Sequence, residues 1–146
     1  MMFSIKSYNE LSKDELFAIL RARVDVFVVE QTCPYPEIDE VDNNELTQHV
    51  FLFKGLKVAA YARCYKKNEQ FSAFGRVLVA EQFRGEGLAS KLVQTAIDTC
   101  KEHWPDKAIM IGAQCYLTGF YQQFGFENVA DDYLEDGIPH QDMCLK

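Results

Sequence analysis

The residues from Gln82 to Leu92 read QFRGEGLASKL, and their types and spacing suit the binding of an anion. Gly85 and Gly87 lie between an apolar stretch and the start of an expected helix. Glycine has no side chain to obstruct a ligand, and it adopts positive φ angles readily. The first amides of a helix lack partners within the helix, and the helix dipole favours negative charge there. The turn therefore predicts a phosphate site made of backbone amides.

Two common phosphate-binding patterns do not fit this turn. A P-loop needs GxxxxGK[ST], and the spacing of glycine, lysine and serine here is different. A Rossmann turn needs GxGxxG after the first strand, whereas Ser90 replaces the third glycine and the preceding strand is expected to be the fourth. A lone GxG pair is weak evidence and by itself favours a plain tight strand-to-helix turn, so the identification of a ligand depends on the surrounding sequence.

The elements that position this turn follow from the hydrophobic pattern. Ser12 and Glu15 form a capping box, which predicts a helix that continues to about Phe27. The stretch 30–45, EQTCPYPEIDEVDNNE, is expected to be an irregular loop. Together these elements predict a mixed α/β sheet in which strand 108–113 runs parallel to its neighbour. The expected strands are 3–5, 49–53, 57–65, 71–79, 108–113, 127–130 and 140–145, and the further helices are 87–101 and 117–124.

The composition restricts the class of protein and of partner. The 146 residues carry a formal net charge of −7, and 48% are apolar, which is typical of one globular domain over 1–146. This acidity argues against a nucleic-acid partner and suits a cationic or amine partner. The five cysteines contain no CxxC pair, so no metal site is expected. No stretch approaches the roughly 18 apolar residues of a membrane helix, and a cytoplasmic protein without a membrane partner is expected.

Two motifs together resemble the GNAT family of N-acyltransferases. Arg84–Ala89 fits R/Q-x-x-G-x-G/A, the family's pattern for the loop that holds the pyrophosphate of acetyl-CoA. RVLV at 76–79 resembles the family's fourth strand, and FYQQFGF at 120–126 resembles its FYxxxGF motif. The motifs occur in the family's order, and the resemblance covers nearly the whole chain. Further stretches, among them EDGIPH at 135–140, resemble the bacterial ElaA subgroup of that family.

The resemblance implies a fold and a cosubstrate. The expected GNAT acyl-CoA N-acyltransferase fold is a mixed, mostly antiparallel sheet of six to seven strands with splayed central strands and about four helices. Acetyl-CoA is expected as cosubstrate, its pyrophosphate on the turn and its pantetheine arm along the fourth strand. The side chain of Arg84 either adds a contact or lies solvated at the surface. The expected cofactor-binding residues are Leu78, Val79, Arg84, Gly85, Glu86, Gly87, Leu88, Ala89 and Tyr121.

The candidate catalytic residues are Tyr121, His49 and Glu30. The resemblance makes Tyr121 the acid that protonates the departing thiolate, since a phenol stays protonated at neutral pH. Packing among its aromatic neighbours is the alternative role. The base stays open, because the stretch 71–75 has no carboxylate where some family members carry a glutamate. His49 is either a base or a structural histidine, Glu30 either lines the acceptor site or caps a helix, and water is a third candidate.

The resemblance implies transfer of an acetyl group from acetyl-CoA to a primary amine by direct attack in a ternary complex. The acceptor is expected to be a small molecule, a polyamine or a peptide, and the acidic stretch 37–45 either attracts it or is simply solvated. Two alternatives are an acyltransferase like the acyl-homoserine-lactone synthases and a non-catalytic sensor that binds acyl-CoA. The acceptor, the acyl chain beyond acetyl and the oligomeric state stay open, with homodimers common in the family.

Overall fold

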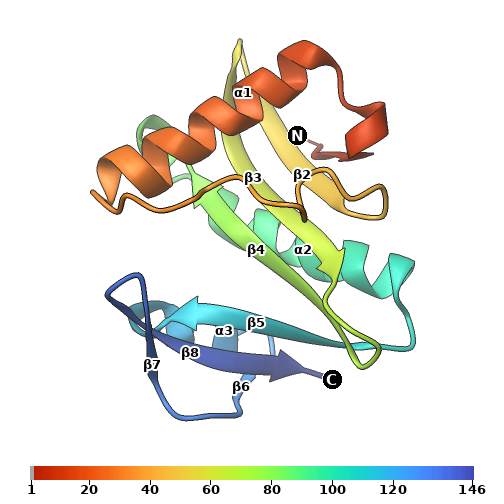
Figure 1. Cartoon of the computed structure of the whole chain (residues 1–146), viewed down its shortest axis with the longest axis vertical. Helices are drawn as coiled ribbons and strands as arrows, with labels where there is room; N and C mark the ends of the chain where they lie inside the picture. Colours follow the sequence, from red (N-terminus) through yellow and green to blue (C-terminus); the bar gives the residue numbers. More distant parts are fainter. Residues whose placement is uncertain (1) are drawn as a thin grey trace.

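The computed structural model describes residues 2–146 and shows a mixed sheet with helices on both faces (Figure 1). The sheet of this range contains β1 (Ser4–Ser7), β2 (Gln48–Lys54), β3 (Lys57–Lys66), β4 (Phe71–Val79), β5 (Ala108–Gln114), β6 (Glu127–Asn128), β7 (Tyr133–Glu135) and β8 (Ile138–Leu145). Its α-helices are α1 (Lys13–Arg23), α2 (Leu88–His103) and α3 (Thr118–Gln122). Residues 2–146 thus hold eight strands and three α-helices, against an expectation of six to seven strands and about four helices.

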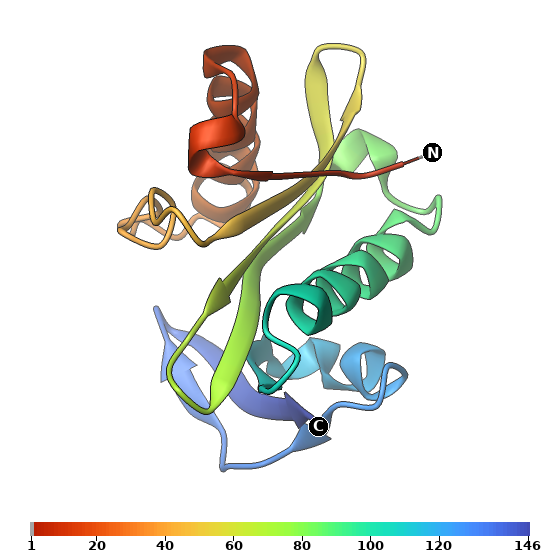
Figure 2. The same ribbon diagram turned by 90° about the vertical axis from the view of Figure 1, so that its right-hand side faces the viewer.

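The strand order is β1-β2-β3-β4-β5-β8-β6, and β7 pairs with β8 outside this path. Strands β1 to β4 form an antiparallel series, and β5 runs parallel to β4 as predicted. Helix α1 covers one face of the sheet, and α2 and α3 cover the other (Figure 2). Each face has its own apolar core, one built around α2 and a smaller one around α1 and the π-helical turn that follows it.

The capping box predicted for the first helix is present. The Ser12 hydroxyl accepts a hydrogen bond from the Glu15 amide at 3.0 Å, and the Glu15 carboxylate accepts one from the Ser12 amide at 2.8 Å. The helix runs further than predicted, because a π-helical turn, Val24–Glu30, continues it. Strand β7 was not expected, since its three residues are all exposed and show no apolar alternation.

The central strands β4 and β5 separate along their length. They pair only at Phe71 with Ala108 and at Ser72 with Ile109, near their first residues. Beyond these pairs they diverge toward their C-terminal ends (Figure 1). The splayed pair expected from the resemblance is therefore present, and it leaves a V-shaped opening inside the sheet.

A β-bulge in β4 lies beyond the last pair with β5, along the opening. Two residues of β4, Arg76 and Val77, face the single residue Ala62 of β3. Arg76 has a φ of 50°, which places a non-glycine residue in the left-handed region. A bulge bends its strand and increases its twist, so β4 curves away from the line that pairing with β5 would need.

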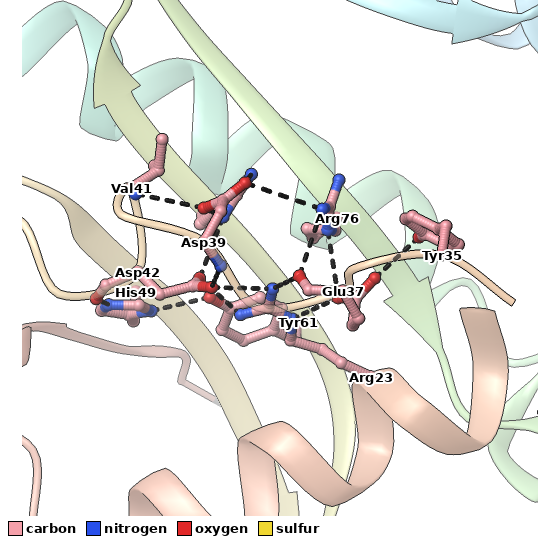
Figure 3. A network of polar contacts seen from close by, with 10 residues as sticks. Arg23, Tyr35, Glu37, Asp39, Val41, Asp42, His49, Tyr61 and Arg76 are labelled. Atoms are coloured by element: carbon pink, nitrogen blue, oxygen red, sulfur yellow. Dashed lines mark hydrogen bonds and ion pairs between the residues drawn. The ribbon is translucent and has the colours of Figure 1, made fainter. Parts of the chain in front are cut away.

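A buried ion network fixes the loop between the π-helical turn and β2 over this bulge (Figure 3). Arg23 is fully buried, and its guanidinium donates to Glu37 and to Asp42, each at 2.6 Å. The same Glu37 carboxylate accepts from Arg76 Nε at 3.0 Å. Arg63 of β3 also donates to Asp42, at 3.0 Å. One arginine of α1 and two of the sheet therefore hold the acidic loop in place.

His49 belongs to this network. Its Nε2 lies 3.0 Å from the Asp42 carbonyl, which can only accept, and its Nδ1 lies 2.6 Å from the Tyr61 hydroxyl. Burial lowers the pKa of His49, so the ring is neutral, with the proton on Nε2 and the Tyr61 hydroxyl donating to Nδ1. Both ring nitrogens are thus occupied.

Replacing Arg23 by methionine should strongly destabilise the fold. The change leaves the Glu37 and Asp42 carboxylates buried without their main partner, which typically costs about 3–5 kcal/mol. Urea denaturation at neutral pH measures the free energy of unfolding. Arg21→Met is the matched control on the same helix: Arg21 is exposed, and its replacement should change stability by no more than about 0.5 kcal/mol. Equal effects of the two substitutions would show that the network does not hold the loop.

Candidate active site

A cleft of about 700 Å³ occupies the opening between β4 and β5. One wall is β4 from Phe74 to Val79, and the other is β5 from Ile111 to Gln114. The π-helical turn, the acidic loop, the start of α2, α3 and the β7–β8 hairpin complete the lining. The cleft therefore extends from the glycine turn to the hairpin.

The inner edge of β4 presents the backbone of Val79 to the cleft. The Ala80 amide donates to the Ala59 carbonyl of β3 at 2.9 Å. Successive residues of an antiparallel strand direct their backbone groups alternately to the two sides, so Leu78 also faces β3, where it pairs with Tyr61. Of the two backbones expected along the pantetheine arm, the structure offers Val79 and turns Leu78 toward β3.

The glycine turn has the form of an open anion site. Gly85 and Gly87 have φ angles of 82° and 79°, and a Cβ added at either would meet nothing within 4 Å. Gly87 is the N-cap residue of the 16-residue helix α2, and no side chain of the described chain caps the amides that follow it. The cleft reaches this turn at Arg84 and Ala89. A pyrophosphate group therefore fits the residues present: free amides, a helix N-terminus and no obstructing side chain.

The side chains beside the turn are paired with each other. The guanidinium of Arg84 donates to both carboxylate oxygens of Glu30 at 2.8 and 3.0 Å, and its Nε donates to the Val79 carbonyl at 2.8 Å. Lys54 forms an ion pair of 2.9 Å with Glu86. The Arg84 guanidinium is thus bonded to Glu30 and Val79 and is not left to contact a pyrophosphate at the glycine amides. The Glu30 carboxylate is in turn occupied by this guanidinium.

Tyr121 lies in α3 and lines the cleft. It is 6% exposed, and its ring packs against Phe74, Phe120 and Phe126. No group in residues 2–146 forms a hydrogen bond with its hydroxyl. Burial, with a smaller effect of Tyr116, raises the pKa of Tyr121 to about 12. The two roles considered for Tyr121 are therefore compatible: the ring is part of the core, and the hydroxyl is a protonated group on the cleft wall.

His49 lies outside this cleft. It is 1% exposed, lies within the ion network of the acidic loop, and is not among the residues that line the cleft. The structure thus brings Tyr121, Glu30, Val79 and the glycine turn to one cleft and leaves His49 outside it.

The β7–β8 hairpin adds polar residues that sequence reasoning missed. His140 and Glu135 line the cleft, with His140 Nε2 3.3 Å from Glu135 Oε2. The Tyr133 hydroxyl donates to Asp142 at 2.9 Å and lies 2.8 Å from where a Cβ on Gly112 would be. The usable signal was the Asp-Gly pair at 136–137, which is typical of a two-residue hairpin turn.

Two further findings concern metals and membranes. In the range 2–146, no three His, Cys, Asp or Glu side chains are grouped so that they could hold a metal ion. Within the same described range, no helix has the length and apolar character needed to cross a membrane.

Comparison with known proteins identifies the family. A family model described as an acetyltransferase (GNAT) domain matches residues 10–146. Protein ElaA of Escherichia coli is 44% identical over 139 residues, which cover 94% of this chain and 91% of that protein. The sequence resemblance to the ElaA subgroup is therefore confirmed.

Solved structures show the same fold. The crystal structure of Escherichia coli ElaA covers 100% of both chains with a TM-score of 0.94 and 41% identity. An acyl-CoA N-acyltransferase from Pseudomonas aeruginosa covers 98% of this chain and 97% of its own, with a TM-score of 0.93 and 35% identity. A CoA-dependent acyl-homoserine lactone synthase, with a TM-score of 0.81, covers 98% of this chain and 82% of its own. Its 18% identity supports a common fold alone.

The match of the family model to residues 10–146 and the 44% identity to ElaA show that this chain belongs to the GNAT acetyltransferase family, whose members transfer acyl groups from acyl-CoA.

Proposed function

We propose that this chain transfers an acetyl group from acetyl-CoA to a primary amine by direct attack within a ternary complex. The observation that carries the proposal is the continuity of one cleft. At one end are the uncapped amides after Gly87, along its wall is the unpaired edge of β4, and the Tyr121 hydroxyl lines it. An anionic, extended cosubstrate and a proton donor therefore have places in the same cavity.

The chain's own backbone would hold acetyl-CoA. Amides from Arg84 to Ala89 suit the pyrophosphate, and short contacts to amides bind an anion whatever the net charge of the protein. The Val79 amide is left as a donor for a pantetheine arm that lies along β4 as an added strand, since the Val79 carbonyl already accepts from Arg84. Bound there, acetyl-CoA supplies a thioester whose acyl carbon an amine can attack.

Tyr121 supplies a proton in this proposal. A bond forms between the amine nitrogen and the acetyl carbon, and the bond between that carbon and sulfur breaks. The thiolate takes the proton of the Tyr121 hydroxyl, and the phenolate regains a proton from the amine nitrogen. Because burial raises the pKa of Tyr121, the hydroxyl is protonated before the reaction. Transfer of its proton to the thiolate therefore has to be coupled to transfer of a proton from the amine nitrogen to the phenolate.

The acceptor side of the cleft carries more negative than positive charge. Glu135, Asp136 and Asp142 of the hairpin region line it, against Lys67 as a cation without an ion pair in the described chain, whereas Arg63 and Arg76 on the opposite wall are paired with carboxylates of the acidic loop. A cationic primary amine on a small molecule, a polyamine or a peptide suits this arrangement. The alternative of an acyl-homoserine-lactone synthase is less well supported, because the likeness to such a synthase is one of fold alone.

A screen tests the function and separates it from the sensor alternative. Calorimetry should show binding of acetyl-CoA at submillimolar ligand, and a thiol-release assay against amines, amino acids and peptides should show turnover. Binding without release of CoA from any amine would favour the non-catalytic sensor. Absence of binding would remove the cosubstrate from the proposal.

The charge of residue 85 should control affinity for CoA. Asp and Asn have the same shape and both tolerate positive φ, so Gly85→Asp and Gly85→Asn differ mainly in one negative charge. A unit charge a few ångströms from pyrophosphate costs about 1 kcal/mol or more, so the Asp variant should bind at least about fivefold more weakly than the Asn variant at low salt. Calorimetry with CoA measures both. Equal affinities would place the pyrophosphate elsewhere.

Removing the Tyr121 hydroxyl should slow chemistry and spare binding. Tyr121→Phe keeps the ring packing, and the lost hydroxyl has no partner in the described chain, so stability should hardly change. We expect kcat at neutral pH to fall about 100-fold, with the dissociation constant of acetyl-CoA unchanged. Steady-state kinetics with the best acceptor from the screen gives the answer, and a fall of less than about twofold would exclude the acid role.

A further inference from the structure

The β7–β8 hairpin brings an imidazole to the acceptor side of the cleft. His140 is the one histidine of the described chain that lines the cleft, and it is 6% exposed. It pairs across the sheet with Gln114 of β5, whose side chain also lines the cleft. An imidazole is the side chain best suited to exchanging protons near neutral pH, so its orientation decides what it can do.

The hairpin backbone fixes the tautomer of His140. Nδ1 lies 2.7 Å from the carbonyl oxygen of Ile138, which can only accept a hydrogen bond. Nδ1 therefore carries the proton of the neutral ring, and Nε2 has the free lone pair. The nitrogen that can accept a proton is thus set by the local backbone.

A carboxylate lies beside that lone pair. Glu135 Oε2 is 3.3 Å from Nε2, and the Glu135 side chain is 60% exposed and free to adjust. With the neutral ring, two acceptors face each other across this gap, and no proton of the chain joins them. The N–H groups of a bound ammonium satisfy both acceptors at once, and the carboxylate then stabilises the imidazolium that forms when the proton moves.

The surroundings hold the ring in this orientation. The Tyr133 ring stacks on His140, with centroids 5.9 Å apart and an interplanar angle of 25°. The Tyr133 hydroxyl is tied in turn to Asp142, above the space that Gly112 leaves free. These two residues and Glu135 are the titratable groups nearest the imidazole on the hairpin. Asp136 at the hairpin turn, and Tyr65 and Lys67 from β3 and the turn after it, line the same cleft.

The two bases proposed from the sequence are occupied. Glu30 is held by two hydrogen bonds from Arg84, and His49 is buried outside the cleft with both nitrogens bonded. Asp142 accepts from Tyr133. His140 Nε2 is therefore an imidazole nitrogen in the cleft that no hydrogen-bond donor of residues 2–146 occupies.

We propose that His140 is the catalytic base of the proposed amine acetylation and that Glu135 binds the acceptor's ammonium group beside it. The inference rests on the proposed function. One ammonium proton passes to Nε2 of His140 and then to solvent, which leaves a neutral amine to attack the thioester carbon. The second proton that the nitrogen loses returns to Tyr121 after the thiolate has taken the tyrosine proton. The net products are the amide, CoA thiol and one released proton.

Three glutamine substitutions test the assignment. His140→Gln should lower kcat/KM for the amine at pH 7.5 by about 100-fold, because glutamine cannot take up the proton. The deficit should narrow toward pH 9.5, where solution itself supplies more neutral amine. Glu135→Gln should act mainly by raising KM for the amine. His103→Gln is the matched control, because His103 lies exposed on α2, and its kinetics should equal those of the wild type.

The results distinguish the possible failures. If the wild type turns over and His140→Gln retains kcat/KM within about twofold of it, the base assignment is overturned and the proposed function stands. No turnover by the wild type with any amine would overturn both. If His140→Gln fails to fold, as judged by urea denaturation, two other measurements test the proposal: the effect of Glu135→Gln on KM for the amine, and the tautomer of His140 in the wild type. Long-range ¹H–¹⁵N NMR spectra of the wild type should show neutral His140 protonated on Nδ1, and a proton on Nε2 would refute the proposal.

Discussion

The separation of β4 from β5 is the constraint on which the rest of the structure depends. Neighbouring strands inside a sheet ordinarily satisfy each other's backbone groups, and buried groups left without partners are costly. Here the pairing stops after Ser72 and Ile109, so the facing edges of the two strands do not satisfy each other, and only single groups such as the Val79 carbonyl have a partner in the chain, Arg84. An extended ligand with amide groups can supply further partners by lying along the edge as a further strand. The same unpaired edges therefore create the cleft and restrict the shape of what can fill it.

Buried charge stabilises this unusual geometry. The bulge at Arg76 is held from outside by Glu37, which Arg23 fixes from α1. Burial is the largest single influence on Asp42 and favours its protonated form. The hydrogen bonds from Arg23 and the Asp39 amide, together with the charges of Arg23 and Arg63, outweigh it, so the pKa of the Asp42 carboxyl is lowered. Replacing such a network with apolar side chains often gives equal stability, so its contribution here lies in specifying position. It determines where the loop between the π-helical turn and β2 lies, and Cys33 and Tyr35 of that loop line the cleft.

Local signals in the sequence predicted what local physics decides. The capping box at Ser12, the glycine turn and the apolar strands each depend on neighbouring residues, and the structure contains all of them. Partners such as Arg23 and Asp42, or His49 and Tyr61, are distant in sequence and meet only through the topology, so no spacing rule could assign them. The hairpin of His140 was missed because its short strand is exposed and polar. The orientation of the Leu78 backbone depends on the bulge, which pattern alone does not locate.

The two ends of the cleft place different demands on charge, and an acidic chain can meet both. At the turn, the nearby cations are paired, Lys54 with Glu86 and Arg84 with Glu30, so backbone amides remain to bind an anion. Amides bind phosphate without an excess of basic residues, so the net charge of −7 is compatible with the cationic acceptor that we propose at the hairpin. In the proposed reaction, acetylation removes the positive charge of that acceptor. The carboxylate that attracts the substrate then has no charge to hold on the product, so the same acidic wall that favours binding of the amine also favours release of the amide.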